Sequence, residues 1–418
     1  MVAYYPPMGW NSWDCYGAAV DEKTVKANAD YMAKNLKKYG WEYIVVDIEW
    51  YQPSVLTHEY QPFAELVMDE YSRLIPAENR FPSAAGGKGF APLAEYVHSL
   101  GLKFGIHIMR GIPRQAAASR SKILNSEYTA DKVAVYNNIC MWNPDMYGTN
   151  PDCPGAADYY NSLFELYAEW GVDFVKVDDI CRNDNNEGEI KLIYDAIKSC
   201  GRDIVLSLSP GPAKLSQAEF LKEYANMWRI TDDFWDRWGL LYAMFERAAA
   251  WAQHSGAGHW PDADMLPIGP INQVYGKENW TKFTCDEQMT MMSLWCMMRS
   301  PLMIGGELNG FDDFTLSLVT NRELLEIEKK SYCARQLYRR VNDGCEEIVW
   351  FAPVTDGSCW YLAIFNAGEK ESNISVDISR LGIAPKKTYD IWLGTEETVS
   401  DSITKRVSPH GVCLLKLS

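Results

Sequence analysis

Several short apolar runs of this chain end in aspartates. Four such carboxylates stand at the ends of different runs, namely Asp47, Asp178, Asp233 and Asp264. The carboxyl ends of parallel strands meet at one end of a barrel, so we expect these side chains to converge there. Converging carboxylates either hold a divalent metal ion or form the nucleophile and the acid of a glycosidase.

A single aspartate at a strand end is more often a helix cap or a loop anchor, and we interpret Asp179 and Asp232 in this way. It is the repetition over several runs that favours a site. The six histidines are dispersed without an HxH or HxxE spacing, so we predict no metal and no cofactor. The carboxylate pair of a glycosidase is therefore the preferred hypothesis.

Neighbouring residues indicate how the two carboxylates would differ. Lys176 lies two residues before Asp178 on the same face of an extended strand, so its charge would keep that carboxylate ionised. Phe234 and Trp235 follow Asp233, and burial beside these rings would raise the pKa of that acid. A retaining enzyme needs such a pair about 5 Å apart.

Eight short β-rich runs alternate with helical segments up to about residue 310, and this pattern predicts a (β/α)8 TIM barrel over residues 1–330. We expect helices at 25–39, 91–99, 159–170 and 187–199, and long insertions at 51–90 and 111–157. The strands are predicted at 8–13, 43–50, 102–109, 172–179, 203–209, 226–231, 258–266 and 300–305.

The pattern changes after residue 330. Short alternating runs separated by Gly, Asp, Asn and Pro predict an antiparallel β-sandwich over residues 331–418. The predicted strands are 346–354, 359–367, 372–379, 387–394 and 411–418. No flexible linker separates the two domains, so we expect them to pack closely.

Composition restricts the partners. The net charge of -16 over 418 residues argues against nucleic acid or an anionic membrane. No apolar run reaches the roughly 18 residues of a membrane span. Eleven cysteines without a CxxC pair, and a start without a basic and then apolar segment, favour reduced thiols and a cytoplasmic protein. A secreted precursor that had been trimmed would show the same features.

Seven segments, in this order along the chain, resemble the motifs of glycoside hydrolase family 27, which contains α-galactosidases and α-N-acetylgalactosaminidases. The resemblance covers nearly the whole chain. It implies a metal-independent, retaining exo-glycosidase that acts on glycosides or oligosaccharides, and it allows a homo-oligomer. The segments are PPMGWNSWDCYG, YIVVDIEWY, LKFGIHI, WGVDFVKVDD, WRITDDFW, GHWPDADMLPIG and DEQMTMMSLWCMMRSPLMIGGEL.

The resemblance also implies roles for single residues. Asp178 in VKVDD corresponds to the nucleophile, and Asp233, four residues after Arg229, corresponds to the acid/base. Positions that contact sugar hydroxyls in the family are occupied here by Lys176, Arg229 and Asp264. Positions that line the pocket are occupied by Trp13, Asp47, His107, Ser209 and Met265.

The chain departs from the family pattern after Asp47. Galactose-cleaving members usually carry a second aspartate there, which holds the sugar's hydroxymethyl group, whereas this chain has Ile48. A buried hydroxyl without a partner costs about 1–3 kcal/mol, or roughly 5- to 150-fold in selection. L-Arabinopyranose has the galactose stereochemistry without this group. We therefore predict β-L-arabinopyranosides as favoured substrates, with some α-D-galactoside activity.

This prediction treats Ile48 as a substrate-binding residue, and it requires a local twist at the strand end. Simple alternation would turn Ile48 away from the face that carries Asp47. Three further positions differ from the family: His107 replaces a tyrosine, Ser209 replaces a glutamate or asparagine, and Ile180 replaces a disulfide cysteine.

Other functions stay open at this point. An ordinary α-galactosidase and an α-N-acetylgalactosaminidase are the alternatives within the family. A sugar-binding protein without catalysis would have lost Asp178 or Asp233, and this chain has both.

Overall fold

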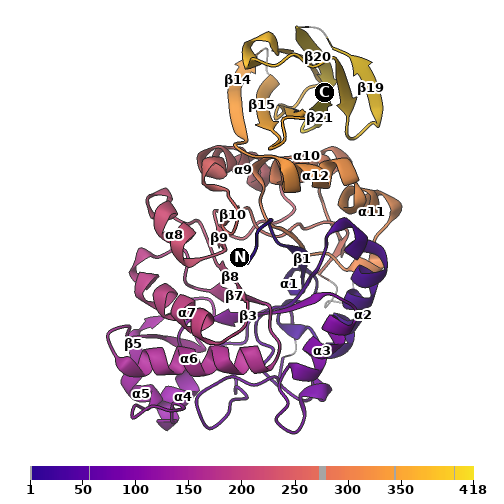
Figure 1. Ribbon diagram of the computed structural model, residues 1–418. Helices are drawn as coiled ribbons and strands as arrows, with labels where there is room; N and C mark the ends of the chain where they lie inside the picture. The colour runs from indigo at the N-terminus through magenta and orange to yellow at the C-terminus, as the bar shows by residue number, and fades with distance from the viewer. Residues whose placement is uncertain (1, 56, 273–278, 343–344, 400) are drawn as a thin grey trace.

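The computed structural model describes residues 2–55, 57–272, 279–342, 345–399 and 401–418. Eight parallel strands form one curved sheet in the order β10-β9-β8-β7-β3-β2-β1-β13 (Figure 1). All eight predicted strands are present, and the barrel prediction is confirmed. They are β1 (Met8–Asn11), β2 (Tyr43–Val46), β3 (Lys103–Met109), β7 (Phe174–Asp178), β8 (Val205–Leu208), β9 (Met227–Arg229), β10 (Trp260–Asp262) and β13 (Leu302–Ile304).

The loop after β10 closes the sheet into a ring. Leu266 forms a parallel bridge with Ile304 of β13. Its N–H donates to the carbonyl oxygen of Met303 at 2.8 Å, and its carbonyl oxygen accepts the N–H of Gly305 at 2.9 Å. This closure fixes the position of Asp264, which lies two residues before the bridge.

Alternation along β2 divides its side chains between two environments. Tyr43 and Val45 belong to an apolar cluster that also contains residues of β7, β8, β9 and β10, which fills the inside of the ring. Ile44 and Val46 belong to the larger cluster shared with the surrounding helices. The strands are therefore buried on both faces, as parallel strands of a barrel are.

Helices surround the ring, and α9, α10 and α12 lie beneath the second domain (Figure 1). Helix α10 begins with a capping box, in which Thr284 and Glu287 exchange hydrogen bonds. This capping box was not predicted from the sequence. The main helices are α2 (Glu22–Tyr31), α3 (Ala91–Ser99), α6 (Pro154–Glu169), α7 (Glu187–Ser199), α8 (Ala218–Tyr224), α9 (Trp238–Trp251), α10 (Cys285–Met298), α11 (Asp313–Thr320) and α12 (Arg322–Lys330).

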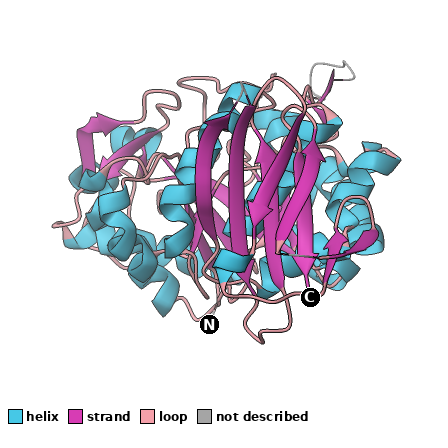
Figure 2. Cartoon of the chain, turned by 90° about the horizontal axis from the view of Figure 1, so that it is seen from above, coloured by secondary structure: helices cyan, strands magenta, loops and turns pink. Residues whose placement is uncertain are grey.

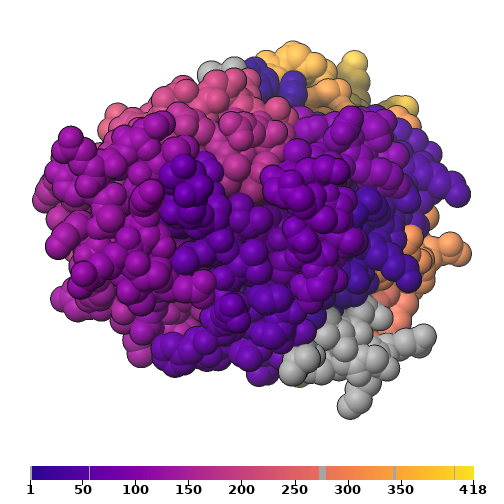
Figure 3. Space-filling view, turned by 90° about the horizontal axis from the view of Figure 1, so that it is seen from below, coloured from indigo at the N-terminus to yellow at the C-terminus, as the bar shows by residue number. Residues whose placement is uncertain are grey.

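The insertion after β3 forms a small subdomain. Its strands β4 (Ile112–Pro113), β6 (Met146–Thr149) and β5 (Ala134–Ile139) pair in the order β4-β6-β5. The short helices α4 (Arg114–Ser119) and α5 (Ala130–Val133) lie beside them. Figure 3 shows the face on which this insertion and the loop after β2 gather. Both insertions follow strand ends, where a barrel builds its site.

The C-terminal region is a β-sandwich, as predicted. A six-stranded antiparallel sheet, in the order β14-β15-β16-β21-β18-β19, packs against the two-stranded sheet β17-β20. Three strands were missed from sequence, because β19 is fully exposed and β14 and β20 carry many charges. The strands are β14 (Arg335–Asn342), β15 (Cys345–Pro353), β16 (Trp360–Asn366), β17 (Ser372–Asp377), β18 (Lys387–Asp390), β19 (Thr395–Thr398), β20 (Ser402–Val407) and β21 (Val412–Leu417).

The other face of the six-stranded sheet lies across barrel helices (Figure 2). Phe365 of β16 packs edge-on against Phe245 of α9, with ring centroids 5.0 Å apart. His410 stacks on Trp238 at 3.7 Å and accepts through its carbonyl oxygen a hydrogen bond from Thr290 at 2.7 Å. The two regions share one hydrophobic cluster, and the predicted boundary at residue 330 stays a prediction.

All eleven cysteines lie in the described residues, and all are free thiols. Arg110, and not a disulfide, holds the loop after β7. Its Nε donates to the carbonyl oxygen of Asp179 at 2.5 Å, and its Nη2 donates to the carboxylate of Asp179 at 2.7 Å. Asp179 is therefore a loop anchor, as predicted. None of the described helices is long and apolar enough to cross a membrane.

Candidate active site

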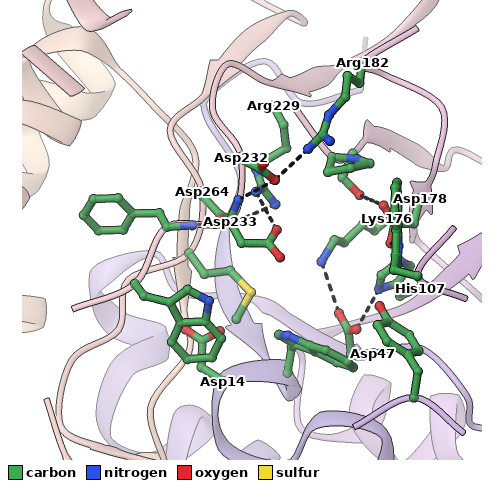
Figure 4. Close-up of a pocket in the computed structure, with 18 residues that line it drawn as sticks. Asp14, Asp47, His107, Lys176, Asp178, Arg182, Arg229, Asp232, Asp233 and Asp264 are labelled. Atoms are coloured by element: carbon green, nitrogen blue, oxygen red, sulfur yellow. Dashed lines mark hydrogen bonds and ion pairs between the residues drawn. The ribbon is translucent and has the colours of Figure 1, made fainter. Parts of the chain in front are cut away.

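A pocket of about 320 Å³ opens at the carboxyl ends of the barrel strands (Figure 4). Ten of the eleven predicted site residues line it: Trp13, Asp47, His107, Lys176, Asp178, Ser209, Arg229, Asp233, Asp264 and Met265. They come from segments up to about 250 residues apart in sequence, and the ring of strands brings them together.

Asp47 lies at the bottom of this pocket between two donors. Its Oδ1 is 2.7 Å from Nδ1 of His107, and its Oδ2 is 3.3 Å from Nζ of Lys176. The register pairs His107 of β3 with Lys176 of β7, and β2 is the neighbour on the other side of β3. Burial would raise the pKa of Asp47, but the charges of His107 and Lys176 outweigh burial and hold that pKa well below its usual range.

The ion pair of Lys176 with Asp47 corrects one expectation. The sequence suggested that Lys176 serves Asp178, because both point to the same face of β7. In the structure Nζ reaches across β3 to Asp47. Alternate strands of a barrel contribute the side chains of one inner layer, so Lys176 of β7 meets a carboxylate that follows β2, the next strand but one.

Asp178 is oriented by three donors at the end of β7. Its Oδ1 accepts the N–H of Asp179 at 2.8 Å and the hydroxyl of Ser209 at 3.4 Å. Its Oδ2 accepts Nε1 of Trp142 at 3.3 Å. Nε2 of His107 faces the same oxygen from 3.7 Å, beyond hydrogen-bonding distance. These contacts direct the carboxylate into the pocket.

Arg229 holds two carboxylates at once. Its Nη2 donates to Asp233 at 3.0 Å, and its Nη1 is 2.8 Å from Asp264. The other oxygen of Asp264 accepts the N–H of Phe234 at 2.8 Å. The Arg229 side chain is only 4% exposed, whereas that of Asp233 is 64% exposed and stands at the pocket mouth. Asp233 thus has a fixed partner below it and open space above it.

The expected rise in the pKa of Asp233 is not found. Burial beside Phe234 and Trp235 would raise it, but the charge and hydrogen bond of Arg229 outweigh burial and lower the pKa below its ordinary value. Sequence reasoning noticed the aromatic neighbours and did not foresee the ion pair, although Arg229 lies four residues away.

Ile48 does not line the pocket, which corrects its prediction as a substrate-binding residue. Its side chain is fully buried in the cluster that Ile44 and Val46 share with the helices. Asp47 continues the inward face of β2, so the next side chain continues the outward face. The local twist that the prediction required is absent from this described segment.

Several lining residues were not predicted: Asp14, Tyr60, Trp142, Arg182, Pro210, Asp232, Phe234 and Trp235. Trp142 comes from the β5–β6 loop, which is far along the chain from every strand of the barrel. No signal in the sequence points to it. Asp232 had been interpreted as a loop anchor, and it does accept the N–H of Asp233 at 3.0 Å. Within the described residues, no group of three His, Cys, Asp or Glu side chains has a metal-binding arrangement.

Figure 4 shows Asp178 and Asp233 on opposite sides of the pocket. Asp178 is fixed by donors, and Asp233 is exposed at the mouth. Asp178 can therefore approach a bound molecule from inside the pocket. Asp233 can exchange a proton with the same molecule at the pocket mouth. This arrangement suits acid-assisted displacement at a carbon held between them.

Comparisons with known proteins agree with this geometry. The family model "Alpha galactosidase A" matches residues 130–330, and "Alpha galactosidase C-terminal beta sandwich domain" matches residues 346–417. "Alpha-galactosidase A" of Cellvibrio japonicus is 27% identical over 443 aligned positions, which cover 100% of this chain and 93% of that protein.

Two solved structures are more similar. A β-L-arabinopyranosidase of glycoside hydrolase family 27 from Geobacillus stearothermophilus is 55% identical, with a TM-score of 0.96, over 100% of this chain and 97% of that chain. A variant of it was solved in complex with arabinose. A Bacillus halodurans protein described as an α-N-acetylgalactosaminidase is 51% identical, with a TM-score of 0.89, over 100% and 99% of the two chains.

Replacing Arg229 by Gln should destabilise the protein in a pH-dependent way. The change leaves the carboxylate of Asp264 buried without its cation, and breaking a buried pair costs about 3–5 kcal/mol. Folding lowers the pKa of Asp233, so the pair stabilises above the unfolded pKa and this contribution is lost as pH falls through the folded value. The difference in Tm from wild type should be largest near neutral pH and shrink below about pH 4.

The matched control is Lys214→Gln, which breaks the exposed pair with Asp184. Its effect on Tm should be small at every pH, because exposed pairs contribute about 0–1 kcal/mol. Equal losses of Tm for Arg229→Gln at low and neutral pH would contradict the electrostatic interpretation.

Proposed function

The chain belongs to glycoside hydrolase family 27, and on this basis we propose that it is a retaining exo-glycosidase whose favoured substrates are β-L-arabinopyranosides, with some activity on α-D-galactosides. The family membership makes it a glycosidase. The retaining course and the choice of sugar are the parts that we propose.

The observation that carries the choice of sugar is the residue after Asp47. Galactose-cleaving members use a second carboxylate there for the hydroxymethyl group, and here the position holds Ile48, which is buried in the barrel wall. This changes the physical reason for the preference. The isoleucine withholds an acceptor from the hydroxymethyl group and does not fill the space that the group would occupy. An arabinopyranoside loses nothing by this, because it lacks the group.

Similarity supports the same choice. The Geobacillus stearothermophilus arabinopyranosidase shares 55% of its residues with this chain over almost its full length. The α-galactosidase of Cellvibrio japonicus shares 27%. An ordinary α-galactosidase is the second candidate, and the retained Asp47 with its two donors is compatible with it, since these groups suit the hydroxyls that both sugars share.

The proposed reaction uses the two carboxylates in turn. Asp233 gives its proton to the glycosidic oxygen while Asp178 attacks the anomeric carbon, so the bond to the leaving group breaks and a glycosyl–Asp178 ester forms. Asp233, now ionised, takes a proton from water, which attacks the same carbon and releases the sugar. Two inversions give net retention.

Arg229 fits both states of Asp233. When Asp233 is ionised, the guanidinium pairs with it at Nη2. When Asp233 is protonated, the same guanidinium still has Asp264 at Nη1 and is not left without a counter-charge. The cation therefore favours the ionised form of Asp233, which acts as the base toward water in the second step, and the protonated form that the first step uses is the less populated one.

The choice of sugar is tested by kcat/KM on p-nitrophenyl β-L-arabinopyranoside, α-D-galactopyranoside and N-acetyl-α-D-galactosaminide. We expect the arabinoside to exceed the galactoside by roughly 5- to 150-fold, the value of one unpaired hydroxyl. A galactoside preference would overturn the proposed sugar and leave the enzyme class intact.

Ile48→Asp should shift this preference toward the galactoside. A carboxylate cannot stay ionised in the apolar cluster without a large cost, so we expect it to turn toward the solvated pocket, where it can accept from the hydroxymethyl group. The ratio of kcat/KM values for the two glycosides measures the shift, and Tm measures the cost to the fold. Ile48→Val is the matched control and should leave the ratio unchanged. A lower Tm with an unchanged ratio would show that the position only stabilises the wall.

Asp178→Ala and Asp233→Ala should each lose most activity, and azide should distinguish them. Azide can take the place of the missing carboxylate in Asp178→Ala and give a glycosyl azide of inverted configuration. In Asp233→Ala it should attack the covalent intermediate and give the retained product. NMR of the anomeric proton identifies each product. Asp184→Ala, an exposed carboxylate on the next loop, is the control, and near wild-type turnover of Asp178→Ala would refute its role.

A further inference from the structure

A separate pocket lies at the junction of the two domains, away from the carboxyl ends of the barrel strands. Its volume is about 320 Å³, the same as that of the candidate active site. Helix α12, which lies between the barrel and the sandwich in Figure 1, forms one wall. The barrel's 3₁₀ turn Lys37–Tyr39 forms a second wall, and residues of β16 and β21 form the third. Binding sites are common where two domains meet.

Positive charge distinguishes this junction pocket from the rest of the chain. The chain as a whole carries a net charge of -16. The pocket is lined by five basic side chains and only two carboxylates, and such an excess of cations attracts an anion. These side chains are Lys38, Arg322, Lys329, Lys330 and Lys416, with Glu323 and Glu326.

Two of the five cations are occupied by the carboxylates. Nζ of Lys416 is 2.8 Å from Glu323, and Lys330 pairs with Glu326 one helical turn away. The other three cations form no ion pair with any residue that the structure describes. Three positive charges of the pocket therefore have no counter-charge from the described part of the chain.

These three cations gather around Tyr39. The guanidinium carbon of Arg322 lies 5.1 Å from the centroid of the Tyr39 ring, and Nζ of Lys38 lies 5.2 Å from it. Nζ of Lys329 is 3.5 Å from the carbonyl oxygen of Tyr39. Contacts with a ring and a carbonyl oxygen do not neutralise the cations, and they leave most of the N–H donors available to a ligand.

The stability of helix α12 accounts for only part of this arrangement. Lysines in the last turn of a helix interact favourably with the helix dipole, which explains Lys329 and Lys330 without a ligand. Lys38 and Lys416 come from other elements, so the preference for helix ends does not place them here. Like charges from three elements repel one another, and a bound anion would remove this repulsion.

The groups of the pocket suit a phosphate monoester better than a single carboxylate. A phosphate group carries about -1.5 to -2 charges near neutral pH and has three acceptor oxygens, and arginine binds it through two N–H donors. The cavity has the size of a small-molecule site, so it also has room for the group that carries the phosphate. Glu323, Glu326 and the hydroxyl of Ser358 line the same space and can accept hydrogen bonds from hydroxyl groups.

We propose that the junction pocket binds a small sugar phosphate, with Lys38, Arg322 and Lys329 around the phosphate group and the two carboxylates toward the sugar hydroxyls. Such a ligand contacts both domains and therefore stabilises their junction. The proposal does not depend on the proposed glycosidase function, because the described linings of the two pockets share no residue.

Isothermal titration calorimetry of the full chain tests this site, with glucose 6-phosphate, inorganic phosphate and glucose as probes. We expect glucose 6-phosphate to bind most tightly, inorganic phosphate to bind more weakly and glucose not to bind. The phosphate supplies the charge, and the sugar adds hydrogen bonds. Added NaCl should weaken both interactions, because it screens exposed charges.

Arg322→Gln should raise the Kd for glucose 6-phosphate about 10- to 100-fold, as for the loss of one charged hydrogen bond. Arg322 is exposed and forms no ion pair with a described residue, so the Tm without ligand should stay unchanged. Arg380→Gln removes a sandwich arginine whose side chain is 86% exposed, and this matched control should leave the Kd unchanged.

Cys359 provides a second readout, which reports where the ligand binds. This residue lines the junction pocket and is 5% exposed, whereas Cys285 at the start of α10 is exposed. Mass spectrometry of peptides measures the alkylation rates of both thiols in one sample. Saturating glucose 6-phosphate should slow the alkylation of Cys359 and leave that of Cys285 unchanged.

Three results would overturn the junction site: no binding of either phosphate compound, equal Kd values for wild type and Arg322→Gln, or an unchanged alkylation rate of Cys359 at saturation. Equal affinities for glucose 6-phosphate and inorganic phosphate would overturn the sugar phosphate and identify free phosphate as the ligand.

Discussion

Charge balance in one small pocket is the constraint on which the rest of this structure depends. Six aspartates line a space of about 320 Å³, and their mutual repulsion would disfavour folding if they stood alone. Lys176, within β7, and Arg229, buried at the end of β9, prevent this. Lys176 neutralises Asp47 at the bottom, and Arg229 bridges Asp264 and Asp233 at the mouth. What the pocket can bind and which proton it can move both follow from these pairings.

The remainder of the fold holds the bridge of Arg229 in place. Nε1 of Trp295 on α10 donates to the carbonyl oxygen of Asp264 at 3.0 Å, and Leu266 fastens the same segment to β13. The sandwich packs on the outside of α10, where Trp392 donates to Ser293 at 2.9 Å. The second domain thus supports the site without contributing a side chain to the described pocket lining. Loss of its packing would reach Asp233 through α10 and Asp264.

The bottom and the rim of the pocket differ in exposure. The bottom is enclosed and charged, and under the proposed function its residues Asp47, His107 and Lys176 suit hydroxyls that galactose and arabinopyranose have in common. Under the proposed function, the buried Ile48 after Asp47 gives the hydroxymethyl group of a galactoside no acceptor. The rim, which includes Arg182 and Asp232, is more exposed and comes from loops that follow the strands.

The barrel, the sandwich and ten of the pocket's lining residues were predicted before the structure was considered. The strands and the carboxylates at their ends followed from local patterns, because the carboxyl ends of parallel strands must meet. Other predicted lining residues, such as Trp13 and Met265, came from the resemblance to the motifs of the family. The alternation of side chains along β2 placed Ile48 on the outward face. The expected twist at the strand end contradicted this local pattern, and the structure follows the pattern. Tertiary structure alone decided the partners: Lys176 with Asp47, Arg229 with Asp233, and Trp142 with Asp178. These pairings join different strands and an inserted loop, so they depend on strand register, tilt and loop packing, which no local pattern of residues specifies.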